Sequence, residues 1–136
     1  MPPATRARPP ALPDGLTGHV KGWLDLDGHF FVGPRYIRLL EGIDATGTIR
    51  EGCRGTRMSY RTCLNRIRQM EQALGRPLVV TSRGGRARGR AELTAEAQRL
   101  IRLYRAWRDR LERASDGAFT AARKELGRLG GGAAGR

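Results

Sequence analysis

The chain has 136 residues, a length that suits one small domain with tails. Its 26 basic and 13 acidic side chains give a formal net charge of +13, which favours a polyanionic partner, nucleic acid before membrane. The sequence offers no nucleophile beside a base, no paired carboxylates in an apolar setting and no cluster of metal ligands, so we expect no enzyme, metal site or cofactor. Because no apolar run approaches the roughly 20 residues of a membrane span, we expect a cytoplasmic, nucleoid-associated protein.

The first part of the chain combines a leader with a hairpin pattern. Residues 1–15 are rich in proline and never reach the length of a signal-peptide core, which predicts a disordered leader before a domain spanning 16–114. Within residues 16–26 apolar and polar side chains partly alternate, and Asp27-Gly28 suits a tight turn into residues 29–32. We therefore expect a hairpin here, near a dimer contact.

Two abutting helices are predicted next. Apolar residues recur at helical spacing after Pro34, and Gly47 can take the left-handed conformation that ends this first helix. Thr48 then begins a capping box for a second helix. Since each glycine costs a helix about 1 kcal/mol relative to alanine, Gly52 and Gly55 predict that the second helix is short and somewhat mobile.

A third helix is predicted from the cap residue Ser59 to Gly75, with one apolar and one polar face. Near its start the polar face carries guanidinium and carboxamide groups, which make bidentate contacts with guanine and adenine edges in the major groove of DNA. The candidate DNA-binding residues of this helix are Ser59, Tyr60, Arg61, Thr62, Asn65 and Arg66. On this helix alone, the alternative that its polar face is an ordinary solvated surface is equally good. Tyr60 either packs inward or reaches a phosphate, and we favour the phosphate.

A cationic hairpin follows the third helix. Residues 78–81 and 90–93 form two short strands, and the glycine-rich segment between them lets the backbone approach a phosphate closely. The candidate DNA-binding residues of this wing are Arg83, Gly84, Gly85, Arg86, Arg88 and Arg90. The alternative is a disordered arginine-glycine loop of the kind that also binds RNA.

The fourth helix, expected over residues 94–114, carries a heptad seam. The seam residues, our candidates for homodimer formation, are Leu93, Ala97, Leu100, Tyr104, Trp107 and Leu111. A helix of this length is roughly 30 Å long, more than a small domain needs to close its core. The alternative is that the seam packs only on the chain's own helices. Residues 115–136 are expected to be a tail with one short helical segment at 118–129.

The two cysteines, Cys53 and Cys63, lie ten positions apart on neighbouring helices, without the close pairs that zinc sites use. We expect both to be small buried apolar residues, with a redox switch as the lesser interpretation. His19 and His29 are isolated, and we assign them no ligand role.

Several segments share a resemblance to one family; they are residues 33–40, 46–49, 58–62, 77–79, the Gly84-Gly85 pair, Leu93-Thr94 and residues 100–104. Over roughly residues 24–111 the chain resembles the N-terminal domain of the molybdate-responsive ModE-type repressors, which are LysR-like winged helices. The resemblance implies that residues 59–66 enter the major groove, that residues 83–90 touch the flanking backbone, and that residues 93–114 mediate dimerisation. ModE proteins that sense molybdate do so through small β-rich domains after the winged helix, which residues 115–136 do not contain. The sequence alone does not distinguish direct sensing of an effector from sensing through a separate partner protein.

Together these patterns predict a mainly α fold with a small β-hairpin wing, a winged helix-turn-helix with a long C-terminal dimerisation helix. The expected function is that of a sequence-specific transcriptional regulator that binds double-stranded DNA as a dimer on a pseudo-palindromic site. The alternative is a nonspecific architectural nucleoid protein or an RNA-binding protein, for which the charge and the arginine-glycine loop alone would suffice.

Overall fold

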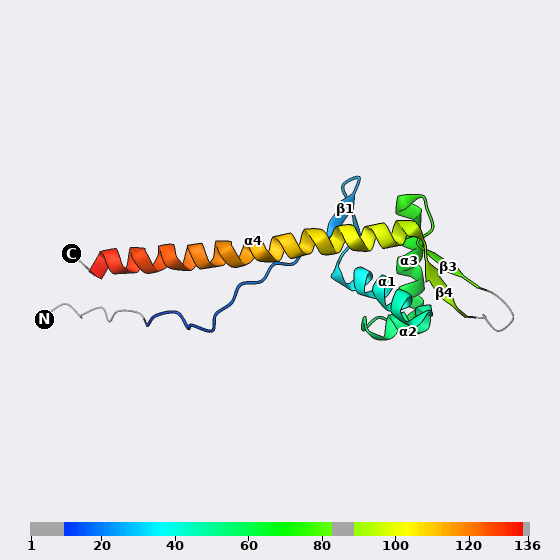
Figure 1. Ribbon diagram of the computed structural model, residues 1–136, viewed down its shortest axis with the longest axis horizontal. Helices are drawn as coiled ribbons and strands as arrows, with labels where there is room; N and C mark the ends of the chain where they lie inside the picture. The colour runs from blue at the N-terminus through cyan, green and yellow to red at the C-terminus, as the bar shows by residue number, and fades with distance from the viewer. Residues whose placement is uncertain (1–9, 83–88, 135–136) are drawn as a thin grey trace, which may run out of the picture. The chain divides into compact units, whose positions relative to one another are not determined.

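The computed structural model describes residues 10–82 and 89–134, with side chains described up to residue 127. Its elements are β1 (Leu24–Leu26), β2 (His29–Val32), α1 (Pro34–Thr46), α2 (Ile49–Arg54), α3 (Tyr60–Leu74), β3 (Val79–Thr81), β4 (Ala91–Leu93) and α4 (Ala95–Ala134), as Figure 1 shows. This mainly helical arrangement with a β3–β4 hairpin and a long last helix confirms the predicted winged helix-turn-helix. The chain divides into two compact units, Val20–Glu112 and a second made of Met1–His19 with Arg113–Arg136.

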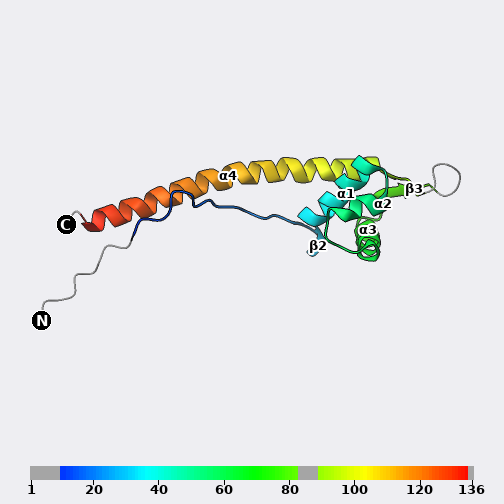
Figure 2. The ribbon, with the colours of Figure 1, turned by 90° about the horizontal axis from the view of Figure 1, so that it is seen from below.

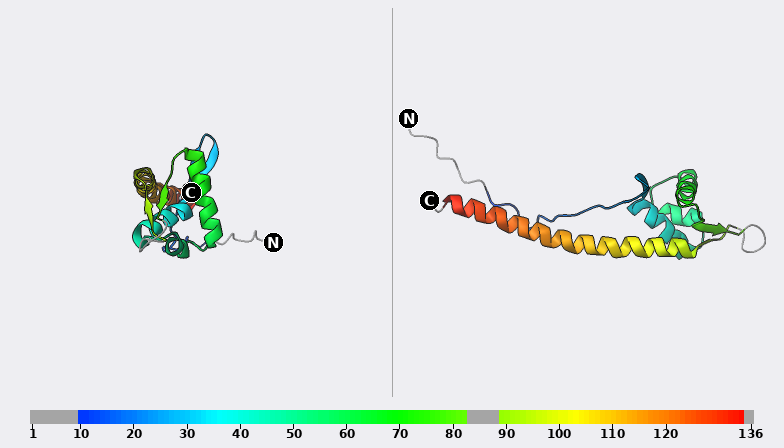
Figure 3. Two further views of the ribbon diagram at one scale, coloured as in Figure 1. Left: turned by 90° about the vertical axis from the view of Figure 1, so that its right-hand side faces the viewer. Right: turned by 90° about the horizontal axis from the view of Figure 1, so that it is seen from above.

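In the larger unit, α1 supplies the centre of the core. Ile37, Leu39, Leu40 and Ile43 have no exposed surface. Gly33 precedes the helix with its carbonyl accepting from the Tyr36 and Ile37 amides, and Pro34 stands in the first turn, as predicted. Figures 2 and 3 show α1 and α2 between α3 and the beginning of α4. The core therefore packs against one face of α3 and leaves the other face of that helix at the surface.

The α1 and α2 helices touch backbone to backbone. A Cβ built on Gly52 would lie 2.6 Å from the Ile43 nitrogen, and one built on Gly42 would lie 2.8 Å from the Gly52 Cα. Thr48 caps α2 as predicted, with its side chain accepting from the Glu51 amide at 3.1 Å. The helix is short, as expected, but the sequence prediction treated Gly52 as a weakness. Gly52 is instead buried and leaves room for α1 to approach.

The turn between α2 and α3 is held by a buried hydroxyl and a disulfide. Thr56 is 3% exposed and donates from Oγ1 to the Cys53 carbonyl at 2.6 Å. Cys53 and Cys63 are buried, as predicted, but they are joined in a disulfide with their Cα atoms 6.2 Å apart. The expectation of two separate apolar thiols is therefore wrong, because the turn brings these two helix positions face to face.

The wing strands are antiparallel, with Val79 opposite Leu93 and Thr81 opposite Ala91. Each strand begins one residue later than predicted and ends where predicted. The Ala91 amide donates to the Gly47 carbonyl at 2.7 Å, so β4 also pairs with the turn between α1 and α2. Thr94 donates from Oγ1 to the Pro77 carbonyl at 2.8 Å and accepts from the Ala97 amide at 3.3 Å. Figure 1 shows the strands beside α3, next to the beginning of α4.

The predicted N-terminal hairpin is present as β1 and β2. Asp27 and Gly28 form its turn with φ values of 52° and 80°, the left-handed region that an Asp-Gly turn tolerates. Phe31 and Val32 are buried in the core. The hairpin is thus part of the domain's own packing.

The last helix, α4, is longer than predicted. It continues without a break to Ala134, where the sequence analysis ended one helix at residue 114 and expected a separate short one. In the second unit, Arg123 on α4 donates to the carbonyls of Leu12 and Pro13, at the end of the segment that we expected to be a leader. Within the described residues, no helix is long and apolar enough to cross a membrane.

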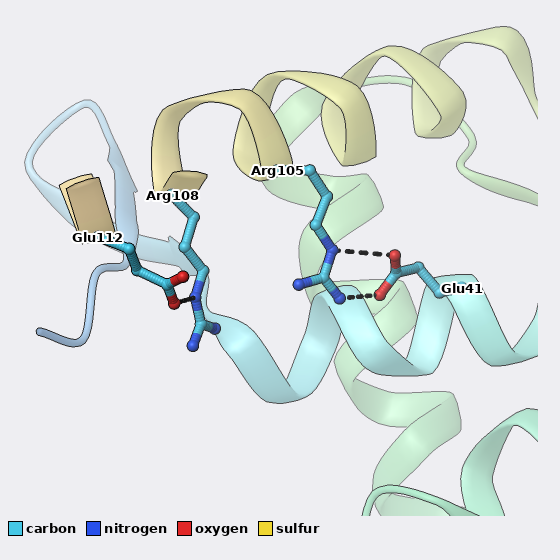
Figure 4. Close-up of polar contacts among 4 residues, drawn as sticks. All are labelled: Glu41, Arg105, Arg108 and Glu112. Atoms are coloured by element: carbon cyan, nitrogen blue, oxygen red, sulfur yellow. Dashed lines mark hydrogen bonds and ion pairs between the residues drawn. The ribbon is translucent and has the colours of Figure 1, made fainter. Parts of the chain in front are cut away.

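An ion pair fixes the beginning of α4 on α1 (Figure 4). Arg105 donates to both carboxylate oxygens of Glu41, with Nε at 3.0 Å from Oε2. The hydrogen bond that Arg105 donates to Glu41, opposed in part by burial, raises the pKa of Arg105 above its ordinary value. Arg108 and Glu112 pair along the helix at 3.2 Å. Because Arg105 and Glu41 lie 64 positions apart, their contact orients α4 against the core.

Candidate nucleic-acid interface

One stripe of α3 is exposed and polar. Arg61, Asn65 and Arg68 are exposed, and Gln72 continues the stripe one turn on. Their spacing of four, three and four places them on one helical face. The sequence analysis named Arg61 and Asn65 for this surface but left Arg68 and Gln72 out. The same spacing from Arg61 could have found both.

Two hydroxyl residues at the start of α3 serve as its cap. Ser59 Oγ accepts from the Thr62 amide at 3.1 Å and donates to Thr62 Oγ1 at 2.9 Å. Both were predicted to bind DNA. Their first role in the structure is to end the turn and begin the helix.

Arg66 lies on a flank of α3. It is half-buried, and its Nη1 donates to Gln69 Oε1 at 2.8 Å. Its guanidinium carbon lies 5.8 Å from the centroid of the Tyr36 ring on α1. The structure therefore separates Arg66 from the stripe with which the sequence analysis grouped it.

Tyr60 lies on the opposite flank and is 38% exposed. The guanidinium carbon of Arg50, on α2, lies 4.4 Å from the centroid of its ring. The sequence analysis weighed inward packing against phosphate contact for this residue. The ring is exposed, so it does not pack inward, and it lies beneath the guanidinium of Arg50. Its contact with a phosphate stays a prediction.

A groove of about 1120 Å³ runs between α2, α3 and the wing strands. Its polar wall residues include Thr48, Arg50, Tyr60, Arg68 and Thr81. Of the wing residues predicted to bind DNA, Arg83, Gly84, Gly85, Arg86 and Arg88 lie outside the described residues. Arg90 is exposed, and its Nη2 would lie 3.4 Å from a Cβ on Gly47, so it extends over the turn between α1 and α2.

The carboxylates at this groove are already engaged. Glu71 Oε2 accepts from the backbone amides of Leu78 at 2.7 Å and Val79 at 3.2 Å. Glu51 pairs with Arg54 at 3.3 Å. Within residues 10–82 and 89–134, no group of three or more His, Cys, Asp or Glu side chains could hold a metal ion. The surface is thus cationic and rich in hydroxyl groups.

The predicted dimerisation seam faces the chain's own core in part. Ala97 and Tyr104 have no exposed surface, and the Tyr104 hydroxyl donates to the Gly22 carbonyl at 3.0 Å. The other four seam residues, Leu93, Leu100, Trp107 and Leu111, are half-buried. Leu103, which the seam pattern omitted, is 60% exposed. A partner helix would therefore meet the edge of the seam.

Comparison with known proteins shows which proteins the chain is similar to. No family model matches the chain. It is 32% identical over 96 residues to the transcriptional regulator ModE of Haemophilus influenzae, covering 71% of this chain and 36% of the relative. It is 38% identical over 81 residues to the DNA-binding transcriptional dual regulator ModE of Escherichia coli K12, covering 60% and 31%. It is 35% identical over 83 residues to the molybdenum transport protein ModE of Azotobacter vinelandii, covering 61% and 31%. The chain spans about a third of the length of these relatives.

Proposed function

We propose that the chain is a sequence-specific transcriptional regulator that binds double-stranded DNA. Its homology to ModE transcriptional regulators supports this proposal and confirms the resemblance noted in the sequence. The observation that carries this proposal is the exposed stripe of Arg61, Asn65 and Arg68 on α3. Arginine reads guanine, and asparagine reads adenine, through paired hydrogen bonds in the major groove. The stripe supplies both kinds of side chain on a rigid helix.

The elements around α3 suit the proposed docking. Its apolar residues Cys63, Ile67 and Met70 are buried in the core, so the polar stripe is the part left to enter a groove. Arg54, Arg57 and Arg90 add exposed positive charge from neighbouring elements. Contacts of such side chains with phosphates position a protein on the duplex, and contacts with base edges give specificity. Binding to chromosomal DNA would also give the protein a nucleoid location.

We further propose that the regulator acts as a homodimer on a pseudo-palindromic site. The beginning of α4 exposes Leu103 beside the half-buried Trp107 and Leu111, which gives a partner helix an apolar edge to cover. A two-fold dimer would present its two recognition helices about 34 Å apart, one turn of the double helix. Sedimentation over a range of protein concentrations tests this, and a species that stays monomeric at the concentrations that bind DNA would refute it.

The test of the function is selection from random duplex DNA at about 150 mM salt, where nonspecific phosphate binding is weakened. A two-fold symmetric motif is the expected result. Retained binding without any motif would instead favour a nonspecific architectural or RNA-binding protein. The absence of duplex binding would refute both DNA-binding functions.

A further inference from the structure

The groove between α2, α3 and β3 has the composition of a phosphate site. Its walls present hydroxyl groups from Thr48 and Thr81 and guanidinium groups from Arg50 and Arg68. The two carboxylates in its lining already have partners: Glu71 accepts from the backbone amides of Leu78 and Val79, and Glu51 pairs with Arg54. An anion entering the groove would therefore meet donors without displacing a paired acid.

Arg50 is the cation that the fold holds in place at this groove. Its side chain is exposed, and its guanidinium carbon lies 4.4 Å from the centre of the Tyr60 ring. None of the ion pairs among the described residues involves Arg50. A guanidinium held over an aromatic ring by a cation–π contact loses less conformational freedom when it binds an anion. The charge of Arg50 is thus ordered and still available.

The position of the groove beside α3 indicates which anion it takes. A helix in the major groove of DNA has a sugar-phosphate strand along each flank, because two such strands border the groove. Tyr60 and Leu64 lie on the α3 flank that lines the groove, next to the exposed stripe. We propose that this groove binds a backbone phosphate of the DNA, with Arg50 as the phosphate ligand and Tyr60 as the residue that positions it. The inference rests on the proposed function and adds a contact from α2.

The experiment measures how the affinity for DNA depends on salt. Wild type, Arg50→Ala and Arg110→Ala are compared on a duplex carrying the selected motif and on a scrambled duplex. Arg110 is exposed on α4 away from the groove, so its variant removes the same charge without the proposed contact. Losing one phosphate contact lowers the steepness of log K against log salt by about 0.9. We expect that change for Arg50→Ala on both duplexes and none for Arg110→Ala.

The role of Tyr60 is separated by two substitutions. Tyr60→Phe keeps a ring beneath Arg50 and removes the hydroxyl, whereas Tyr60→Leu removes the ring. If the ring positions Arg50, Phe preserves affinity, Leu weakens binding to both duplexes, and adding Tyr60→Leu to Arg50→Ala causes little further loss. Equal losses from Phe and Leu would refute the positioning role, because the hydroxyl would then make the contact.

The outcomes also distinguish this inference from the proposed function. If wild type selects a motif but Arg50→Ala leaves the salt dependence unchanged, the phosphate site is wrong and the regulator stands. If Arg50→Ala changes the preferred base at one position, Arg50 reads a base and the inference is again wrong. If wild type binds no duplex DNA, the proposed function itself fails. Circular dichroism of each variant verifies the fold, and the exposed position of Arg50 makes folding insensitive to its loss.

Discussion

Replacing Gly52 by alanine would put a methyl group into the contact between α1 and α2. The new Cβ would lie 2.6 Å from the backbone nitrogen of Ile43 and 2.9 Å from the carbonyl carbon of Gly42. Neither atom can rotate away as a side chain can, so the two helices must separate. Overpacking of this kind costs about 1–3 kcal/mol, and rigid backbone neighbours place Gly52 at the upper end.

The net effect combines this cost with a gain. Alanine favours the helix by about 1 kcal/mol over glycine. We therefore expect Gly52→Ala to lower the free energy of unfolding by about 2 kcal/mol, which for a domain of this size lowers the melting temperature by about 8–16 °C. Urea unfolding followed by circular dichroism measures the change, and an unchanged m value would show that the unfolded state is not responsible.

Gly55→Ala is the matched control. Gly55 has a φ of −77°, and a Cβ there meets nothing within 4 Å. The same substitution three residues away should leave stability unchanged or raise it by about 0.4–1 kcal/mol. A Gly52→Ala variant as stable as Gly55→Ala would refute the argument that backbone contact requires glycine at this position.

Three further outcomes are expected. Reducing the Cys53–Cys63 disulfide should lower the stability of the domain by about 2–4 kcal/mol, seen as a lower unfolding midpoint in the presence of dithiothreitol, and no change in the midpoint would mean that the bond adds nothing. Tyr104→Phe should cost about 1 kcal/mol in chemical unfolding, since it removes the hydrogen bond to the Gly22 carbonyl, and wild-type stability would show that water replaces this bond. Asn65→Ala should reduce discrimination at one base pair by about 1–3 kcal/mol in competition binding, and an equal loss on every sequence would mean that Asn65 contacts only the backbone.

The parts of the fold that could be predicted are those set by local chemistry. Thr48, Ser59 and Gly75 begin or end helices through contacts with residues three or four positions away, so the sequence alone indicates them. Asp27-Gly28 likewise determines its own turn. The order of these signals was enough to predict the winged helix-turn-helix.

The parts that could not be predicted depend on contacts between distant segments. From the sequence, Gly52 only weakens α2; its role appears in the structure, where α1 contacts it closely. The sequence analysis grouped Arg66 with Asn65 on one face of α3. In the structure Arg66 lies on a flank of α3, beside the ring of Tyr36 on α1. Arg105 has an acidic neighbour four residues on, yet it pairs with Glu41 across the domain. In each case the deciding partner is far away along the chain.

The Thr94 hydroxyl joins the start of α4 to the Pro77 carbonyl at the end of the α3 segment, and the backbone of β4 joins the same region to Gly47. These bonds set the rotational phase of α4 relative to the helix proposed to read DNA. A residue inserted just after Thr94 would turn every later position on α4 by about 100° and move it about 1.5 Å along the axis. Within the larger unit, Thr94 therefore sets the direction in which the side chains of α4 point.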